Sequence, residues 1–330
     1  MTSPPVSSAA AASPPGLRNL SLDLLKVVMA AMVIGLHGGF LRDVNPAAAS
    51  YFTNGLFRIA VPTFFLINGY YLERLLDRGV WPWFRRMLVL YGLWMLIYGP
   101  RWLRPDVRPL EDIAKDALIG FYHLWYLIAL IAAASLLQLL RWRFGRRSGP
   151  LALAAGLTFV TGLSIQYLGN FHLIPNPAID DWLNTVDSYR NFLFFGFPFL
   201  AFGVLIARFE PVISRLSRWY LPLTILGLAA LTLEWGLNYH FNRQNSVFEI
   251  YLSLALLCPM LFLTVKARTL MGRNRSIGLF ATGIYLIHVW VLHLTYYVEM
   301  GDTARTLIGL AVSATLAPLL VLANRRLPLL

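Results

Sequence analysis

The stretch LSLDLLKVVMAAMVIGLHGG, residues 20–39, decides the fold. It is apolar apart from a few polar side chains, and as an α-helix it would be about 30 Å long, the thickness of the hydrocarbon core of a bilayer. It lacks the strict alternation of polar and apolar residues that a half-buried strand shows. We therefore predict that it forms a membrane-spanning helix.

Nine further apolar blocks of similar length follow it along the chain. The ten blocks lie near residues 20–40, 51–72, 84–103, 118–140, 151–168, 190–207, 219–236, 247–266, 277–296 and 304–323. A membrane barrel would instead show alternating segments of about ten residues. The sequence therefore predicts an all-α, polytopic integral membrane protein of about ten transmembrane helices.

The composition excludes a water-soluble domain. Of the 330 residues, 58% are hydrophobic and 13% are charged, whereas about 25% are charged in soluble domains. The net charge of +12 comes from short basic clusters between apolar blocks, which indicates membrane topology and not binding of nucleic acid. A single cysteine, Cys258, excludes intramolecular disulfides and a cysteine metal cluster.

The basic residues also predict the orientation of the chain. With the N-terminus inside, 18 basic residues fall on the cytoplasmic side and 8 on the other, while Lys26 and Arg58 remain within spans. By the positive-inside rule both termini are expected in the cytoplasm. Residues 1–18, rich in Pro, Ala and Ser, are expected to be a disordered tail, and residues 19–326 a single membrane domain.

The first block carries three ionisable residues, Asp23, Lys26 and His37. The steps from Lys26 to His37 turn a helix through about 1100°, within about 20° of three full turns, so these two side chains share a face about 16 Å apart. Asp23 lies one turn before Lys26 on that face. Ionisable groups within a membrane are functional candidates, and an imidazole suits general base catalysis. A snorkelling Asp23–Lys26 pair and a packing role for His37 remain the alternatives.

The second block carries candidate groups at both ends. Arg58 would lie in its outer half, and Pro62 would kink the helix near mid-depth. Near the cytoplasmic end, Asn68-Gly69 would either end the helix or let backbone approach a ligand. Arg85 and Arg86 follow at the cytoplasmic mouth. They serve either as topology anchors or as bidentate ligands for the phosphates of a cytoplasmic donor.

Four of the six histidines are predicted near one depth. His37, His123, His288 and His293 all fall in the outer halves of spans, which is more than helix packing accounts for. Trp125 lies two residues after His123 and is an ordinary interfacial residue on its own. No HExxH motif or closely paired ligand spacing is present, so we expect no metal site.

Five segments in order resemble the acyltransferase 3 family of integral membrane acyltransferases, which modify surface sugars and related acceptors. The segments, which lie between residues 18 and 296, are DLLKVVMAAMVIGLHG (23–38), RIAVPTFFLINGYYL (58–72), WFRRMLVLYGLW (83–94), HLWYLIALI (123–131) and GIYLIH (283–288). The first is similar to the family's Arg-x10-His helix and the second to its FF-x-x-SG segment. Lys26 replaces the usual arginine and Asn68 the usual serine.

The resemblance implies a reaction and a location. An acyl group, most often acetyl, would pass from cytoplasmic acyl-CoA to a hydroxyl of a cell-surface or exported glycan, in the bacterial inner membrane. His37 would be the catalytic base, assisted by Lys26 and its neighbour Asp23. The donor site would include Arg85, Arg86, Asn68 and Gly69. Arg58, His123, Trp125 and His288 would bind substrate, the last three around either the acceptor or the donor tunnel.

Two other functions remain open at this stage. A transporter or flippase would use the same polar path without chemistry, although no pair of matching halves is evident in the sequence. A structural or partner-binding membrane subunit would tolerate replacement of both Lys26 and His37.

Overall fold

The computed structural model describes residues 18–242, 247–273 and 276–330, and these are almost entirely helical. The long helices are α1 (Leu20–Gly38), α3 (Ala60–Leu76), α4 (Trp81–Ile97), α7 (Trp125–Phe144), α8 (Ser148–Asn170), α11 (Phe197–Arg208), α13 (Tyr220–Phe241), α14 (Leu254–Ala267), α15 (Ser276–Thr295) and α16 (Asp302–Ala323). The predicted all-α class is confirmed.

Short helical segments connect the long ones. They are α2 (Pro46–Asn54), η1 (Leu56–Ile59), α5 (Gly99–Trp102), α6 (Leu110–Ile119), η2 (Tyr122–Leu124), α9 (Pro177–Asn184), α10 (Val186–Tyr189), the π-helical η3 (Phe192–Gly196), α12 (Glu210–Ile213) and η4 (Ser214–Trp219). Two short strands, β1 (Arg18–Asn19) and β2 (Met271–Gly272), pair antiparallel. The predicted disordered tail lies outside the described residues except for Arg18, which pairs with Gly272.

In the described part of the chain, six of the ten predicted blocks form helices that are long and apolar enough to cross a membrane. They are Leu20–Gly38, Tyr122–Phe144, Ser148–Asn170, Glu210–Phe241, Ser276–Thr295 and Asp302–Ala323. Two more blocks form shorter apolar helices, Phe192–Arg208 and Leu254–Ala267. The last two blocks overlap α3 and α4, of 17 residues each. The chain is thus a multi-pass membrane protein, while ten spans and cytoplasmic termini remain predictions.

Two details of the predicted helices are wrong. The block at 247–266 becomes helical only at Leu254, because side chains from other helices bind the backbone of the residues before it. Pro62 does not kink a helix at mid-depth. It lies in the first turn of α3, which begins at Ala60, where its missing N–H has no intrahelical partner to lose.

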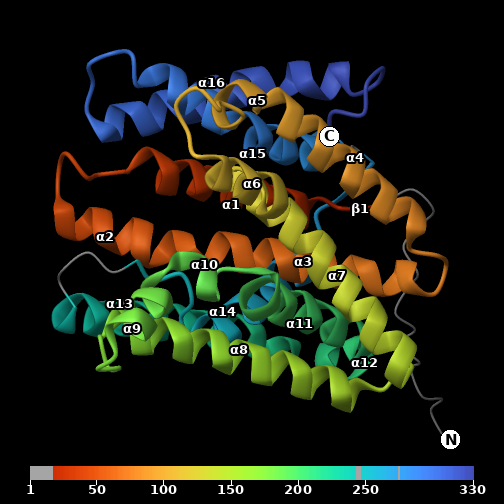
Figure 1. The fold of residues 1–330 in the computed structure, drawn as a ribbon. Helices are drawn as coiled ribbons and strands as arrows, with labels where there is room; N and C mark the ends of the chain where they lie inside the picture. The colour runs from red at the N-terminus through yellow and green to blue at the C-terminus, as the bar shows by residue number, and fades with distance from the viewer. Residues whose placement is uncertain (1–17, 243–246, 274–275) are drawn as a thin grey trace, which may run out of the picture.

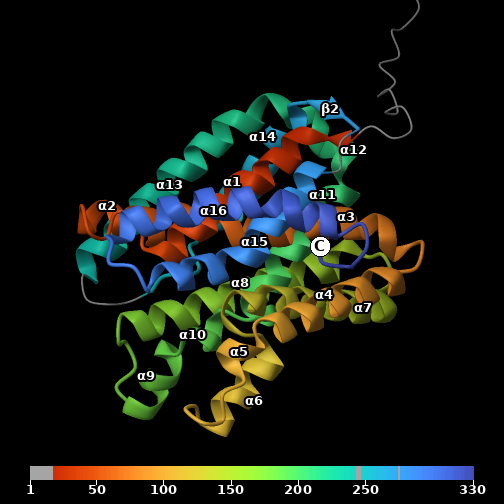
Figure 2. The ribbon, with the colours of Figure 1, turned by 90° about the horizontal axis from the view of Figure 1, so that it is seen from above.

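The helices run roughly side by side in layers. In Figure 1, α15 and α16 lie above α1 and α3, and α8, α11 and α13 lie below them. The view from above shows α4 and α7 on one side of α1 and α3, with α13 on the other (Figure 2). The residues after α16 return to lie beside α4, as both views show. Helix α1 therefore runs through the bundle with neighbours on several sides.

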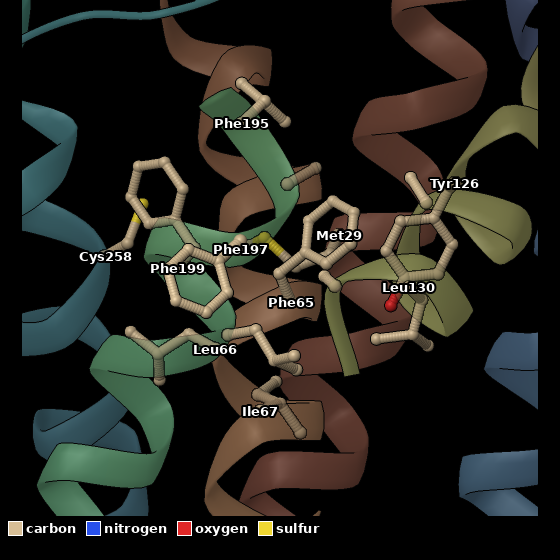
Figure 3. Packing of buried hydrophobic residues seen from close by; sticks show 14 of the residues in the cluster. Met29, Phe65, Leu66, Ile67, Tyr126, Leu130, Phe195, Phe197, Phe199 and Cys258 are labelled. Carbon is tan, nitrogen blue, oxygen red and sulfur yellow. The ribbon is translucent and has the colours of Figure 1, made fainter. Parts of the chain in front are cut away.

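The centre of the bundle is packed with aromatic side chains. Figure 3 shows Phe65 of α3 among Met29 of α1, Tyr126 of α7 and the phenylalanines of η3 and α11. Phe65, Phe195 and Tyr126 form ring contacts with centroids 4.7–6.2 Å apart. Cys258 is buried in the same cluster.

Helices α3 and α11 approach each other through two glycines. A Cβ on Gly69 would lie 1.9 Å from the carbonyl oxygen of Leu200, and a Cβ on Gly203 would lie 2.0 Å from that of Leu66. Asn68-Gly69 lies inside α3, so the expectation of a helix end there is wrong. The backbone that approaches Gly69 belongs to α11, and such small residues allow close contact between membrane helices.

We expect Gly69→Ala to destabilise the protein by about 1–3 kcal/mol or more, because neither backbone can yield without moving a helix. The thermal unfolding midpoint of detergent-solubilised protein measures this. Gly92→Ala in α4 is the matched control, because nothing lies within 4 Å of a Cβ there. An unchanged midpoint for Gly69→Ala would contradict the proposed role of this contact.

Candidate functional site

Helix α1 carries Lys26 near one end and His37 near the other, and the two ends of the bundle are named after them here. At the Lys26 end, Lys26 Nζ lies 3.3 Å from Asp23 Oδ1 and 5.7 Å from the centre of the Tyr71 ring. Asp23 is buried. The carboxylate thus holds the lysine within the protein, at the wall of a cavity.

That cavity has a volume of about 750 Å³ and lies between α1, α3, α4, α7 and α15. Its polar lining includes Lys26, Asn68, Arg86, Tyr126 and Tyr285, and the remainder is mainly apolar. Asn68 donates hydrogen bonds of 2.9 Å to the Phe64 carbonyl and to Tyr126 Oη. The cavity therefore has cationic groups and a long apolar wall.

The two arginines of the WFRRM segment differ in position. Arg86 lines the larger cavity and donates a 3.1 Å hydrogen bond to the Leu330 carbonyl. Trp94 Nε1 donates to the Leu329 carbonyl at 2.9 Å, so the residues after α16 form part of the cavity wall. Both arginines are exposed, and Arg85 does not line the cavity.

Three histidines from three elements meet beyond the larger cavity. The His37 ring of α1 lies 5.4 Å from the His288 ring of α15, and the His123 ring of η2 lies 5.0 Å from that of His288, between ring centres. His123 and His288 are buried. The described residues contain no group of three or more His, Cys, Asp or Glu side chains that could hold a metal ion.

A hydrogen bond fixes the orientation of the buried His288 ring, whereas His123 is held through its backbone carbonyl. Nδ1 of His288 lies 2.6 Å from the Tyr285 carbonyl, so this nitrogen carries the proton and Nε2 keeps its lone pair. Tyr285 Oη donates to the His123 carbonyl at 2.5 Å. Because Tyr285 also lines the larger cavity, it connects that cavity to the three histidines.

A second, smaller cavity of about 170 Å³ opens at the His37 end. His37 lines it together with Arg101, His293 and aromatic side chains from α15 and η2. His37 Nδ1 lies 3.2 Å from Tyr122 Oη. His37 therefore faces the smaller cavity, Tyr285 faces the larger one, and His123 and His288 lie between them.

Arg58 belongs to a buried ion-pair cluster at the same end. It lies 2.5 Å from one carboxylate oxygen of Glu249, and Arg190 lies 3.1 Å from the other. The Arg190 guanidinium lies 5.2 Å from the centre of the Trp125 ring. Arg58 and Trp125 line neither cavity, so they are near the site only through this cluster. Gly69, expected in the donor site, packs against α11.

Sequence reasoning missed several groups that the fold brings to the site: Tyr122, Tyr285, Arg101, Arg190 and Glu249. Glu249 had a signal, because it is a carboxylate within a predicted span and such residues are functional candidates. Tyr285 lies in the GIYLIH segment, and Tyr122 directly precedes His123. Arg101 and Arg190 lie beside apolar blocks and gave no local signal.

Comparisons with known proteins identify a family. A model described as an acyltransferase domain, acyltransferase 3, matches residues 19–323. The chain is also 27% identical over 304 residues to a serine/alanine racemase of Enterococcus gallinarum and 23% identical over 296 residues to an amino-acid racemase of Enterococcus faecalis. These alignments cover 86% and 84% of this chain but 42% of each relative. The chain thus spans about two fifths of the length of those relatives. No solved structure matches.

We expect Glu249→Gln to lower the free energy of unfolding by about 3–5 kcal/mol, because the buried Arg58 and the half-buried Arg190 lose their counter-charge. Asp106→Asn is the control: the Arg104–Asp106 pair is exposed and such pairs contribute about 0–1 kcal/mol. Thermal unfolding in detergent measures both. Equal shifts in the two variants would argue against a structural role for the Glu249 cluster.

Proposed function

Because the chain belongs to the acyltransferase 3 family, we propose that it transfers an acyl group, most often acetyl, from acyl-CoA to a hydroxyl group of a cell-surface or exported glycan. The observation that carries this proposal is that two cavities approach a cluster of three histidines from opposite sides, the smaller one lined by His37 and the larger one by Tyr285, whose hydroxyl bonds the His123 carbonyl. A transferase whose two substrates arrive from opposite sides of a membrane needs an entrance for each and one place where both are held in reacting geometry.

The larger cavity suits the donor. Its volume of about 750 Å³ is within the usual range of ligand pockets, about 300–1,000 Å³. Lys26 and Arg86 supply positive charge for phosphate groups, and the apolar lining suits an extended pantetheine arm. Arg86 would exchange its hydrogen bond to the Leu330 carbonyl for a phosphate oxygen. Lys26 and His37 are about 16 Å apart along α1, which suits a donor that reaches from one to the other.

His37 is the proposed general base. It would take the proton of the acceptor hydroxyl as the oxygen forms a bond to the thioester carbonyl carbon. The carbon–sulfur bond then breaks, and the proton passes to the departing thiolate. Tyr122 Oη, 3.2 Å from His37 Nδ1, would orient the imidazole. Two substrates held at one base supply much of the rate enhancement in such a reaction.

The sidedness follows from the distribution of basic residues. Most of the arginine clusters are expected at the Lys26 end, and by the positive-inside rule this supports a cytoplasmic donor entrance with the smaller cavity on the opposite side. This orientation corresponds to a bacterial inner membrane protein with cytoplasmic acyl-CoA and an acceptor that arrives from outside.

A transporter without acyl chemistry is the second candidate. Cavities that extend from both ends of the bundle toward buried polar groups also suit passage of a small molecule. The relatives named racemases act, by their names, on amino acids. Release of free thiol from acetyl-CoA by purified protein distinguishes the two, since a transporter releases none above background.

We expect His37→Ala to reduce acceptor-dependent thiol release from acetyl-CoA by about 10²–10⁴-fold, the usual contribution of a general base. His240→Ala is the matched control, because His240 is exposed on α13 and lines neither cavity. Both variants are expected to insert into membranes at wild-type levels. Wild-type activity in His37→Ala would refute the assigned role.

We expect Arg86→Ala to raise KM for acetyl-CoA by about tenfold, the effect of losing about 1.4 kcal/mol of binding, with little change in kcat. The double variant with Arg85→Ala tests whether the exposed neighbour adds to donor binding. Arg143→Ala, exposed on α7, controls for loss of surface charge. If KM is unchanged in the double variant, both arginines are topology anchors.

A further inference from the structure

The smaller cavity carries a positive charge without a negative counterpart. Its lining contains Arg101 and two histidines but no carboxylate. Arg101 pairs with no carboxylate in the described residues, although Arg104 and Arg108 pair with Asp106 and Asp116. Arg101 is half-buried, so its guanidinium is only partly hydrated.

A second surplus charge lies behind this cavity. Arg58 and Arg190 share the single carboxylate of Glu249, which leaves one positive charge uncompensated. Both arginines lie within electrostatic range of His37, and Arg190 also acts on Tyr122. Arg58 and Arg190 therefore add positive charge near the reacting histidine.

Two of the acidic groups at this end have partners of their own. Asp302 pairs with Arg305 and lies 3.9 Å from Arg42. Asp43 accepts hydrogen bonds from the hydroxyl and backbone N–H of Thr303, and the bond from the hydroxyl is the main reason that the pKa of this carboxyl is below its usual range. Both carboxylates are therefore engaged with groups other than Arg101.

A half-buried guanidinium that pairs with no carboxylate in the described residues is costly to dehydrate, so it indicates a ligand of opposite charge. Arginine binds carboxylates and phosphates with two parallel hydrogen bonds. The cavity has a volume of about 170 Å³, whereas ligand pockets usually have 300 Å³ or more. The cavity therefore accommodates only the reacting end of a larger acceptor. Trp290, Tyr296 and Phe121 offer ring faces to that end.

We propose that the acceptor is anionic, and that Arg101 binds a carboxylate or phosphate group on the same unit that carries the reacting hydroxyl. This inference rests on the proposed function. Because Arg101 and His37 line one small cavity, the anionic group and the hydroxyl must be close together in the acceptor, as they are within a single sugar residue. Arg101 is thus a specificity-determining residue.

Glucose, glucuronate and glucose 6-phosphate test the proposal, since they share a ring and differ at C6. Calorimetric titration of the purified protein in nanodiscs measures their binding. We expect glucuronate or glucose 6-phosphate to bind at least about tenfold more tightly than glucose, and added salt to weaken this preference. The two arms distinguish a carboxylate acceptor from a phosphate acceptor. Arg101→Gln is expected to abolish the preference, and Arg104→Gln to retain it.

Equal binding of the three sugars, no binding of either anion, or a preference that persists in Arg101→Gln would each overturn the proposal. The proposed function is scored separately by thiol release from acetyl-CoA. If this release depends on His37 while the charge preference is absent, the proposed acyl transfer is supported and the proposed anionic acceptor is refuted.

Discussion

The contact between α1 and α15 is the interaction on which both cavities depend. It places the His37 and His288 rings 5.4 Å apart, and small residues bring α16 close to both helices. A Cβ on Gly38 of α1 would lie 2.3 Å from Thr306 Oγ1 of α16, and Gly283 of α15 faces Ala317 of α16. Such small residues let membrane helices approach closely. Wider spacing would separate the imidazoles and join the two cavities into one open path.

A second constraint is that backbone polar groups inside an apolar bundle need partners from the protein. The segment before α14 shows how this is met. Gln166 Oε1 accepts hydrogen bonds from the backbone of Glu249 and Ile250, and Nε2 donates to the Ile250 carbonyl. Glu234 accepts from the backbone N–H groups of Leu252 and Ser253 in the same way. This irregular segment places Glu249 between Arg58 and Arg190, which sets the charge near His37.

Much of the fold follows from the sequence because local patterns determine it. Long apolar blocks predict helices, and the helical repeat places Lys26 and His37 on one face of α1. The similar depth of the histidines follows from block order alone, and the structure brings His37, His123 and His288 together.

Contacts between elements far apart in the sequence could not be predicted from it. The asparagine-glycine pair at 68–69 looks like a helix end, yet Gly69 packs against Leu200, 131 positions later. The link from Arg86 to Leu330 joins residues with no shared pattern. Arg101 looks like one more charged residue beside a span, and only its place in the smaller cavity distinguishes it. Such pairings depend on which helices become neighbours, which no local periodicity encodes.

The most direct test is an electron cryomicroscopy map of the protein with a non-hydrolysable thioether analogue of acetyl-CoA, with an antibody fragment to aid alignment. The account predicts density along the larger cavity, with the phosphates beside Lys26 and Arg86 and the sulfur next to Tyr285 and the three histidines. Density that lies outside this cavity, or a sulfur remote from His37, would contradict the assignment of the donor path and the reaction centre.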